Sequence, residues 1–187
     1  ALEIADVVKV LTGQTQGLIF DLSAALGGEV LAGAGLAGSG AEGAAQISAA
    51  ITTGQAAERF GKMVAAQGGP TGFVEQAACS LRHADVVIEA TAPHAGYVSA
   101  IDGEVLGLVV VDLGGGRRVE TDQINSAVGL CDVVALGRWV ERGDLLAQVH
   151  AARRSHAERA VQQVRHAVHL SETAPKPAPL VYDRVVR

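Results

Sequence analysis

The chain has 187 residues, and 15 Lys and Arg stand against 20 Asp and Glu, a formal net charge of −5 at pH 7. This acidic balance argues against a nucleic-acid partner, whose binding surface would be basic. Hydrophobic residues make up 49% and charged residues 19%, which excludes intrinsic disorder. Since no apolar run reaches the roughly 18 residues of a membrane span, we expect no membrane partner and a folded, cytoplasmic protein of one or two domains.

The first 80 residues predict helices only, because apolar side chains recur at the spacing of one helical face. In the second helix such a face is defined by Leu18, Leu22, Ala25, Leu26 and Val30. Ser39 and Glu42 have the spacing of a capping box and predict the start of the third. The predicted helices cover 2–11, 18–32, 39–53, 56–67 and 72–79.

The start of the chain lies inside the first of these helices. Ala1 is neither a Met nor a residue that caps a helix. We therefore expect further residues upstream in the natural protein, with removal of the initiator Met and a frayed start as the alternative.

From about residue 81 the pattern changes to mixed α and β. β-branched runs and their flanking turns predict strands. Leu106–Leu113 is a short and largely apolar run ended by glycines, which favours a buried helix. Ser155 and Glu158 form a second capping box and open a helix to about Val168, with Arg159, Arg165 and His166 on its solvated face. The predicted strands cover 86–90, 96–101, 133–136, 145–150 and 180–185, the last after an extended proline-rich linker at 174–179.

Two glycine-rich motifs are better explained as structural elements than as phosphate sites. Gly33–Gly38 has the dinucleotide-binding spacing, but a helix precedes it where that motif needs a strand, so we interpret it as a helix–helix connector. Gly114–Gly116 follows a helix, whose exposed carbonyl groups repel anions, and so predicts a C-terminal cap. Arg117 and Arg118 then suit the negative end of the helix dipole.

The histidines and cysteines do not form a recognisable site in the sequence. The six histidines are dispersed, and no arrangement typical of a metal site or a catalytic triad can be derived from their spacing. Cys79 and Cys131 lie 52 positions apart, which indicates neither a disulfide framework nor a zinc cage. The loop at 119–126 carries Glu120, Asp122 and Asn125 and is a candidate mobile element.

The segment 137–149 has the rhythm G-x-x-V-x-x-G-x-x-L-x-x-V. It resembles the half-repeat of biotinyl- and lipoyl-type carrier domains, whose paired strands form a sandwich. Such a carrier needs a lysine in its hairpin, but Lys9, Lys62 and Lys176 all lie outside 81–171. We therefore expect a shared shape without the swinging-arm chemistry.

Five segments of the chain form a recognisable series when they are taken in order. They are ALEIADVVKVLTG at 1–13, GKMVAAQGGP at 61–70, GLVVVDLGGGRR at 107–118, ALGRWVERGDLLAQVHA at 135–151 and TAPKPAPLVYDRV at 173–185. This series resembles the C-terminal part of the thymidine phosphorylase / pyrimidine-nucleoside phosphorylase family. The similarity extends over essentially the whole chain and corresponds to the later two-fifths or so of a family member.

This resemblance implies an α/β protein in two parts. Residues 1–80 would be a helical remnant of the family's large α/β domain, and 81–187 a mixed α+β domain resembling a hammerhead or barrel sandwich. The implied reaction is the phosphorolysis of thymidine to thymine and 2-deoxyribose 1-phosphate, with phosphate as co-substrate and no cofactor. The whole enzyme is expected to be a homodimer.

The family's catalytic and phosphate-binding groups belong to its N-terminal part, so we predict no catalytic, substrate-binding or metal-binding residue here. The segment 117–126 matches a loop near the mouth of the family's cleft, which implies Arg117, Arg118, Glu120 and Asp122 as candidates for a role in cleft closure. Asp6 falls where related phosphorylases place a glutamate ligand of a structural cation. Since the other ligands are missing, we expect Asp6 to face solvent or cap a neighbour.

Two hypotheses follow. In the first, the chain is the C-terminal part of a phosphorylase and is inactive alone. In the second, it is a free-standing, non-catalytic scaffold or partner-binding module with a carrier-like sandwich. A long upstream coding region with a lysine-bearing glycine loop would favour the first. If that part is absent, 1–80 should expose an apolar face and self-associate or repack, with 81–187 the better ordered.

Overall fold

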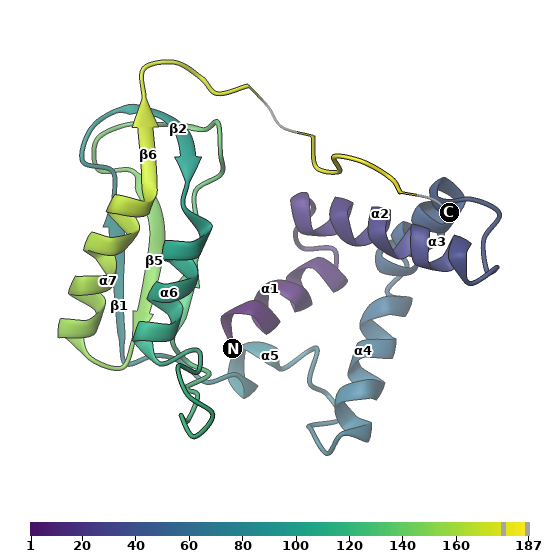
Figure 1. Cartoon of the computed structure of the whole chain (residues 1–187). Helices are drawn as coiled ribbons and strands as arrows, with labels where there is room; N and C mark the ends of the chain where they lie inside the picture. Colours follow the sequence, from purple (N-terminus) through teal and green to yellow (C-terminus); the bar gives the residue numbers. More distant parts are fainter. Residues whose placement is uncertain (177–178, 186–187) are drawn as a thin grey trace. The chain divides into compact units, whose positions relative to one another are not determined.

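The computed structural model describes residues 1–176 and 179–185. The chain divides into two compact units. The sheet unit comprises Ala1–Leu2 and Leu81–Pro177, and the helical unit comprises Glu3–Ser80 and Ala178–Arg187 (Figure 1). Among the described residues, no helix combines the length and apolar character that crossing a lipid bilayer requires.

The sheet unit contains two three-stranded antiparallel sheets. The first has the order β1-β5-β3 and the second β4-β2-β6. The strands are β1 (Val86–Thr91), β2 (Gly96–Ile101), β3 (Gly129–Cys131), β4 (Trp139–Val140), β5 (Leu145–Ala151) and β6 (Val168–Ser171). The predicted mixed α/β class is confirmed, and the described strands do not close into a barrel.

Two helices complete this unit, α6 (Gly103–Leu113) and α7 (Arg154–Ala167). In Figure 1 they lie beside the strands, and α7 contacts β1, β5 and α6. The side chains at this junction are completely or almost completely buried: Val98, Val109, Val140, Leu146, Val149 and Val164. One continuous apolar core therefore joins both sheets and both helices.

The ends of α6 follow from its sequence. The Oδ1 atom of Asp102 accepts a hydrogen bond from the Val105 amide at 3.0 Å, so the helix begins before the predicted Leu106. Gly114 ends it with φ +96°, a left-handed conformation that glycine adopts without steric cost. The interpretation of Gly114–Gly116 as a helix cap is confirmed.

Some predictions for the second half are wrong. Residues 133–136 form no strand; instead the buried Val134 donates one backbone hydrogen bond to the Leu146 carbonyl at 2.8 Å. Strands β3, β4 and β6 were not predicted. Helix α7 begins at Arg154, so Ser155 lies within its first turn and caps nothing. Val168 ends the helical spacing and begins β6.

The prediction that Arg165 lies on a solvated face is also wrong. Its Nε donates to the Thr91 carbonyl oxygen at 2.9 Å and its Nη2 to the Thr91 hydroxyl at 3.0 Å. These partly buried hydrogen bonds connect α7 to the end of β1. Arg159 and His166 are exposed, as predicted.

The helical unit is built from short helices joined by glycine-containing turns. The helices are α1 (Leu2–Leu11), α2 (Leu18–Gly33), α3 (Gly40–Thr52), α4 (Gln55–Ala66) and α5 (Ala77–Ser80). The segment Gly33–Gly38 is the predicted connector between α2 and α3. The predicted helix at 72–79 is reduced to α5. The Ser39 hydroxyl oxygen caps α3 by accepting a hydrogen bond from the Glu42 backbone amide at 3.1 Å. The Glu42 carboxylate accepts a hydrogen bond from the Gly38 backbone amide, and not from that of Ser39 as a capping box requires.

Helices α2 and α3 pack with their backbones close together. A Cβ atom on Gly28 would lie 2.4 Å from the Gly40 carbonyl oxygen and from the Ala44 amide nitrogen. The buried positions of α2 are therefore Ala24 and Gly28. The predicted apolar face of α2 is only partly covered: Leu22 and Ala25 are half-buried, whereas the other three members are exposed, Leu18 to 68%, Leu26 to 54% and Val30 to 70%.

The end of the chain differs from its prediction. Residues 180–185 are irregular and form no strand. Arg184 donates from its Nη2 to the Glu29 carboxylate of α2 at 2.8 Å, within the helical unit. Pro177 and Ala178, part of the predicted linker, lie outside the described residues.

Candidate functional site

The loop after α6 carries the four residues predicted to take part in cleft closure. The Asp122 carboxylate accepts hydrogen bonds from the backbone amides of Arg118 at 2.9 Å and Val119 at 3.2 Å. These two bonds close the loop into a turn. The Asn125 amide donates to the Gly114 carbonyl at 2.8 Å and so brings the end of the loop back to the end of α6.

A charge pair fastens the same loop to α6. The Arg118 guanidinium forms an ion pair and hydrogen bond with the Asp112 carboxylate. The hydrogen bond from Arg118 lowers the pKa of Asp112 below its usual value, with smaller contributions from Gln163 and Arg159, while the pKa of Arg118 is raised. The two backbone hydrogen bonds lower the pKa of Asp122. Both carboxylates are therefore anionic at neutral pH.

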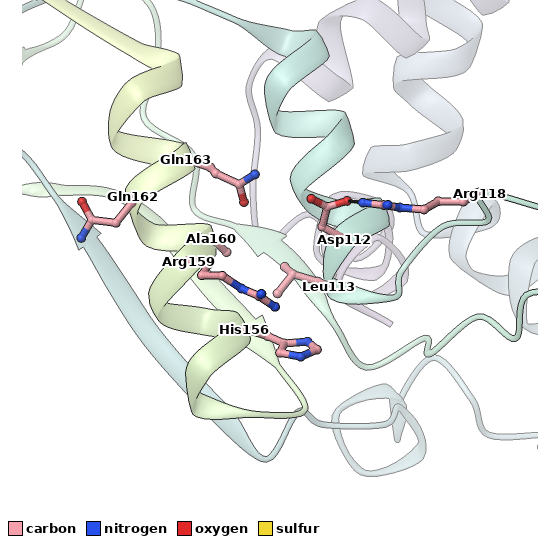
Figure 2. A pocket seen from close by; sticks show the side chains of 8 residues that line it. All are labelled: Asp112, Leu113, Arg118, His156, Arg159, Ala160, Gln162 and Gln163. Atoms are coloured by element: carbon pink, nitrogen blue, oxygen red, sulfur yellow. Dashed lines mark hydrogen bonds and ion pairs between the residues drawn. The ribbon is translucent and has the colours of Figure 1, made fainter.

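Next to this pair lies a pocket of about 460 Å³ between α6 and α7. Figure 2 shows Asp112 and Arg118 joined on the α6 side, and His156, Arg159 and Gln163 extending from α7. The complete lining is Asp112, Leu113, Arg118, His156, Arg159, Ala160, Gln162 and Gln163. The arrangement surrounds one carboxylate with cationic and amide groups, which fixes the position of a loop by electrostatics and hydrogen bonds.

The structure thus brings Arg118 and Asp122 together, whereas Arg117 and Glu120 lie exposed on the loop. Asp112 was missed in the sequence because it lies in a run of apolar residues. A signal was present: an acidic residue in the last turn of a helix opposes the helix dipole and favours a nearby cation, here one of the two arginines that follow the glycines.

Asp6 is a partly exposed residue of α1. Its Oδ1 accepts from the Lys9 ammonium group at 2.8 Å. Within residues 1–176 and 179–185, no group of three or more His, Cys, Asp and Glu side chains is arranged to hold a metal ion.

Comparison with known proteins connects this architecture to one family. Residues 97–171, from β2 to β6, match the pyrimidine nucleoside phosphorylase C-terminal domain. Over 183 residues the chain is 36% identical to a thymidine phosphorylase of Colwellia psychrerythraea strain 34H. The chain corresponds to the C-terminal part of the pyrimidine nucleoside phosphorylase family. The alignment covers 97% of this chain but only 42% of that relative, so the chain spans less than half of its length.

Proposed function

We propose that this chain is the C-terminal part of a thymidine phosphorylase, which converts thymidine and phosphate into thymine and 2-deoxyribose 1-phosphate. The supporting observation is the 36% identity to the Colwellia thymidine phosphorylase along almost the whole chain. In this proposal the whole enzyme is a cytoplasmic homodimer of pyrimidine salvage, and it needs phosphate as co-substrate but no cofactor.

In this proposal the chain holds a loop in place at the mouth of the cleft, and the catalytic groups lie in the part of the enzyme outside the chain. Arg117, Arg118, Glu120 and Asp122 belong to a loop that orders at the cleft mouth when the enzyme closes. The Asp112–Arg118 pair supports this role because it fixes the start of the loop to a helix of the core. Phosphorolysis by the isolated chain is therefore expected to be absent.

A chimera tests the proposal. The 183-residue matching segment of the Colwellia enzyme is replaced by the corresponding residues of this chain, and thymine release from thymidine and phosphate is measured. The controls are the Colwellia enzyme without that segment and the 187-residue chain alone. We expect thymine from the chimera and from neither control.

Two results would contradict the proposal. One is a chimera that is folded by circular dichroism and elutes like the Colwellia enzyme, yet releases no more thymine than the truncated control. The other is turnover by the isolated chain at the rate of the complete enzyme. The first result would favour the alternative, a non-catalytic partner-binding module. That alternative has one structural observation in its favour: within the segment that has the carrier-like rhythm, β4 and β5 belong to different sheets, and Gly137 and Gly143 have positive φ.

A further inference from the structure

The face of the β1-β5-β3 sheet that carries His150 holds a second group of reactive side chains. Strand register pairs Cys131 with Gln148 and Gly129 with His150, so Cys131 and His150 are diagonal neighbours on one face. The Cys131 Sγ lies 3.2 Å from the His150 Nε2. A thiol and an imidazole are thus within hydrogen-bonding distance, the spacing that a nucleophile and its base require.

Two further acceptors surround the sulfur. Its distance is 3.5 Å to the Asp132 Oδ2 and 3.6 Å to the Gln148 Oε1. Asp132 has φ +50°, and this left-handed turn directly after β3 accompanies the approach of its carboxylate to the thiol. The negative charge of Asp132 disfavours a free thiolate, so the proton stays on the sulfur until a base removes it.

His150 is suited to be that base. Burial is the main influence on the imidazole and lowers its pKa, whereas Asp132 acts in the opposite direction and His83 adds to the lowering. The ring is therefore mostly neutral at pH 7, and its Nε2 can accept the thiol proton when the tautomer carries hydrogen on Nδ1. Cys131 itself is partly exposed, so a small reagent can reach it.

We propose that Cys131 is a thiol–disulfide exchange site, with His150 as its base, and that it takes low-molecular-weight disulfides. The proton of Cys131 passes to the His150 Nε2 while the sulfur attacks one sulfur atom of the disulfide. The old S–S bond breaks, and the leaving thiolate takes the proton from the imidazolium. One thiol and one disulfide give one mixed disulfide and one thiol, so no further oxidant is needed.

The chain supplies its own control, because Cys79 is an exposed cysteine. The 187-residue chain is treated with oxidised glutathione, and the modified peptides are quantified by mass spectrometry over time. We expect Cys131 to react about tenfold faster than Cys79 at pH 7, although it is the less exposed thiol. An equal or slower reaction at Cys131 would overturn the proposal.

Two substitutions distinguish base catalysis from simple exposure. His150→Gln keeps an acceptor but cannot take the proton, so the rate at Cys131 should fall about tenfold at pH 7 and approach the original rate above pH ~9.5, where the thiol ionises unaided. Asp132→Asn removes the opposing charge and should raise the rate. A fall of less than about threefold for His150→Gln at pH 7, in a chain with unchanged circular dichroism, would refute a base role.

The unmodified chain gives the same test without a substitution. For a cysteine that reacts without a neighbouring base, the rate falls about tenfold for each pH unit below the pKa of the thiol, because only the thiolate reacts. With a neutral imidazole as base, the rate at Cys131 should instead be nearly constant between about pH 6.5 and 8. Parallel pH profiles for the two cysteines would contradict the proposal.

Discussion

The two units of this chain bury apolar side chains in different ways. All of the largest completely buried side chains belong to the sheet unit, among them Leu146, Val149 and Val164. In the helical unit, α4 has no buried residue and α2 buries only Ala24 and Gly28. The sheet unit is stabilised by a shared apolar core, whereas α2 and α3 are held together by close contact of their backbones.

This difference agrees with the place of the chain in its family. A helical unit that exposes Leu18, Ile19 and Val30 presents apolar surface that folded proteins usually cover. The apolar exposure expected for 1–80 is therefore observed. In the proposed enzyme, the part of the relative that the alignment leaves out would supply the cover. Self-association of the isolated chain stays a prediction.

The largest loss of stability should come from a substitution in the apolar core of the sheet unit. Leu146 is completely buried, so Leu146→Ala should reduce the free energy of unfolding by about 3 kcal/mol through lost burial and a residual cavity. Leu26→Ala in the helical unit is the matched control and should cost less than about 1 kcal/mol, because the side chain is already mostly exposed. Urea unfolding measures both; equal losses would remove the contrast between the units.

A second effect tests the close packing of α2 on α3. Gly28→Ala should destabilise the helical unit by about 2 kcal/mol, because the added methyl group collides with backbone atoms of α3 that cannot rotate away. Gly33→Ala in the same helix meets no atom within 4 Å and should be neutral or slightly stabilising. Amide hydrogen exchange of α2 and α3 reports the result. Similar protection in the two variants would show that the helices do not approach this closely.

A third effect concerns Arg165, which joins α7 to β1. Arg165→Ala should cost about 1.5 kcal/mol, because it removes two hydrogen bonds from a charged group to Thr91. The control is His166→Ala, an exposed neighbour on the same helix, with an expected change within about 0.5 kcal/mol. Thermal unfolding monitored by circular dichroism compares them. Identical midpoints would mean that Arg165 is solvated in solution, as its sequence position first suggested.

Local signals predicted much of the fold. Helices 2–11, 18–32 and 56–67 and strands 86–90 and 145–150 could be read from periodicity and β-branched runs, since such segments carry their own pattern. The strands that were missed are short, and β4 has only two residues, which is too few for a pattern. Their pairing depends on residues distant in the sequence.

The candidate sites were likewise predicted only where their residues lie close together in the sequence. Arg118 and Asp122 were predicted from the resemblance of their loop to one near the family's cleft mouth. Asp112 and the Cys131–His150 pair instead depend on contacts that a linear sequence does not display. The spacing of 19 residues between Cys131 and His150 matches no familiar motif. Only the antiparallel register of β3 and β5 brings them together.

The smallest expected effect is on the pKa of Asp112, which pairs with Arg118 of the loop after α6. The pKa of Asp112 is lowered by Arg118, so this pair stabilises the fold above the ordinary aspartate value of 3.8 and is lost as the pH falls through the lower value in the folded chain. Carboxyl-carbon NMR should therefore give a midpoint below 3.8 for Asp112. Arg118→Ala should raise that midpoint and change Asp122 less, because the backbone amides that hold Asp122 remain. If both midpoints moved equally, the loop would be ordered by the ion pair and not by its own turn.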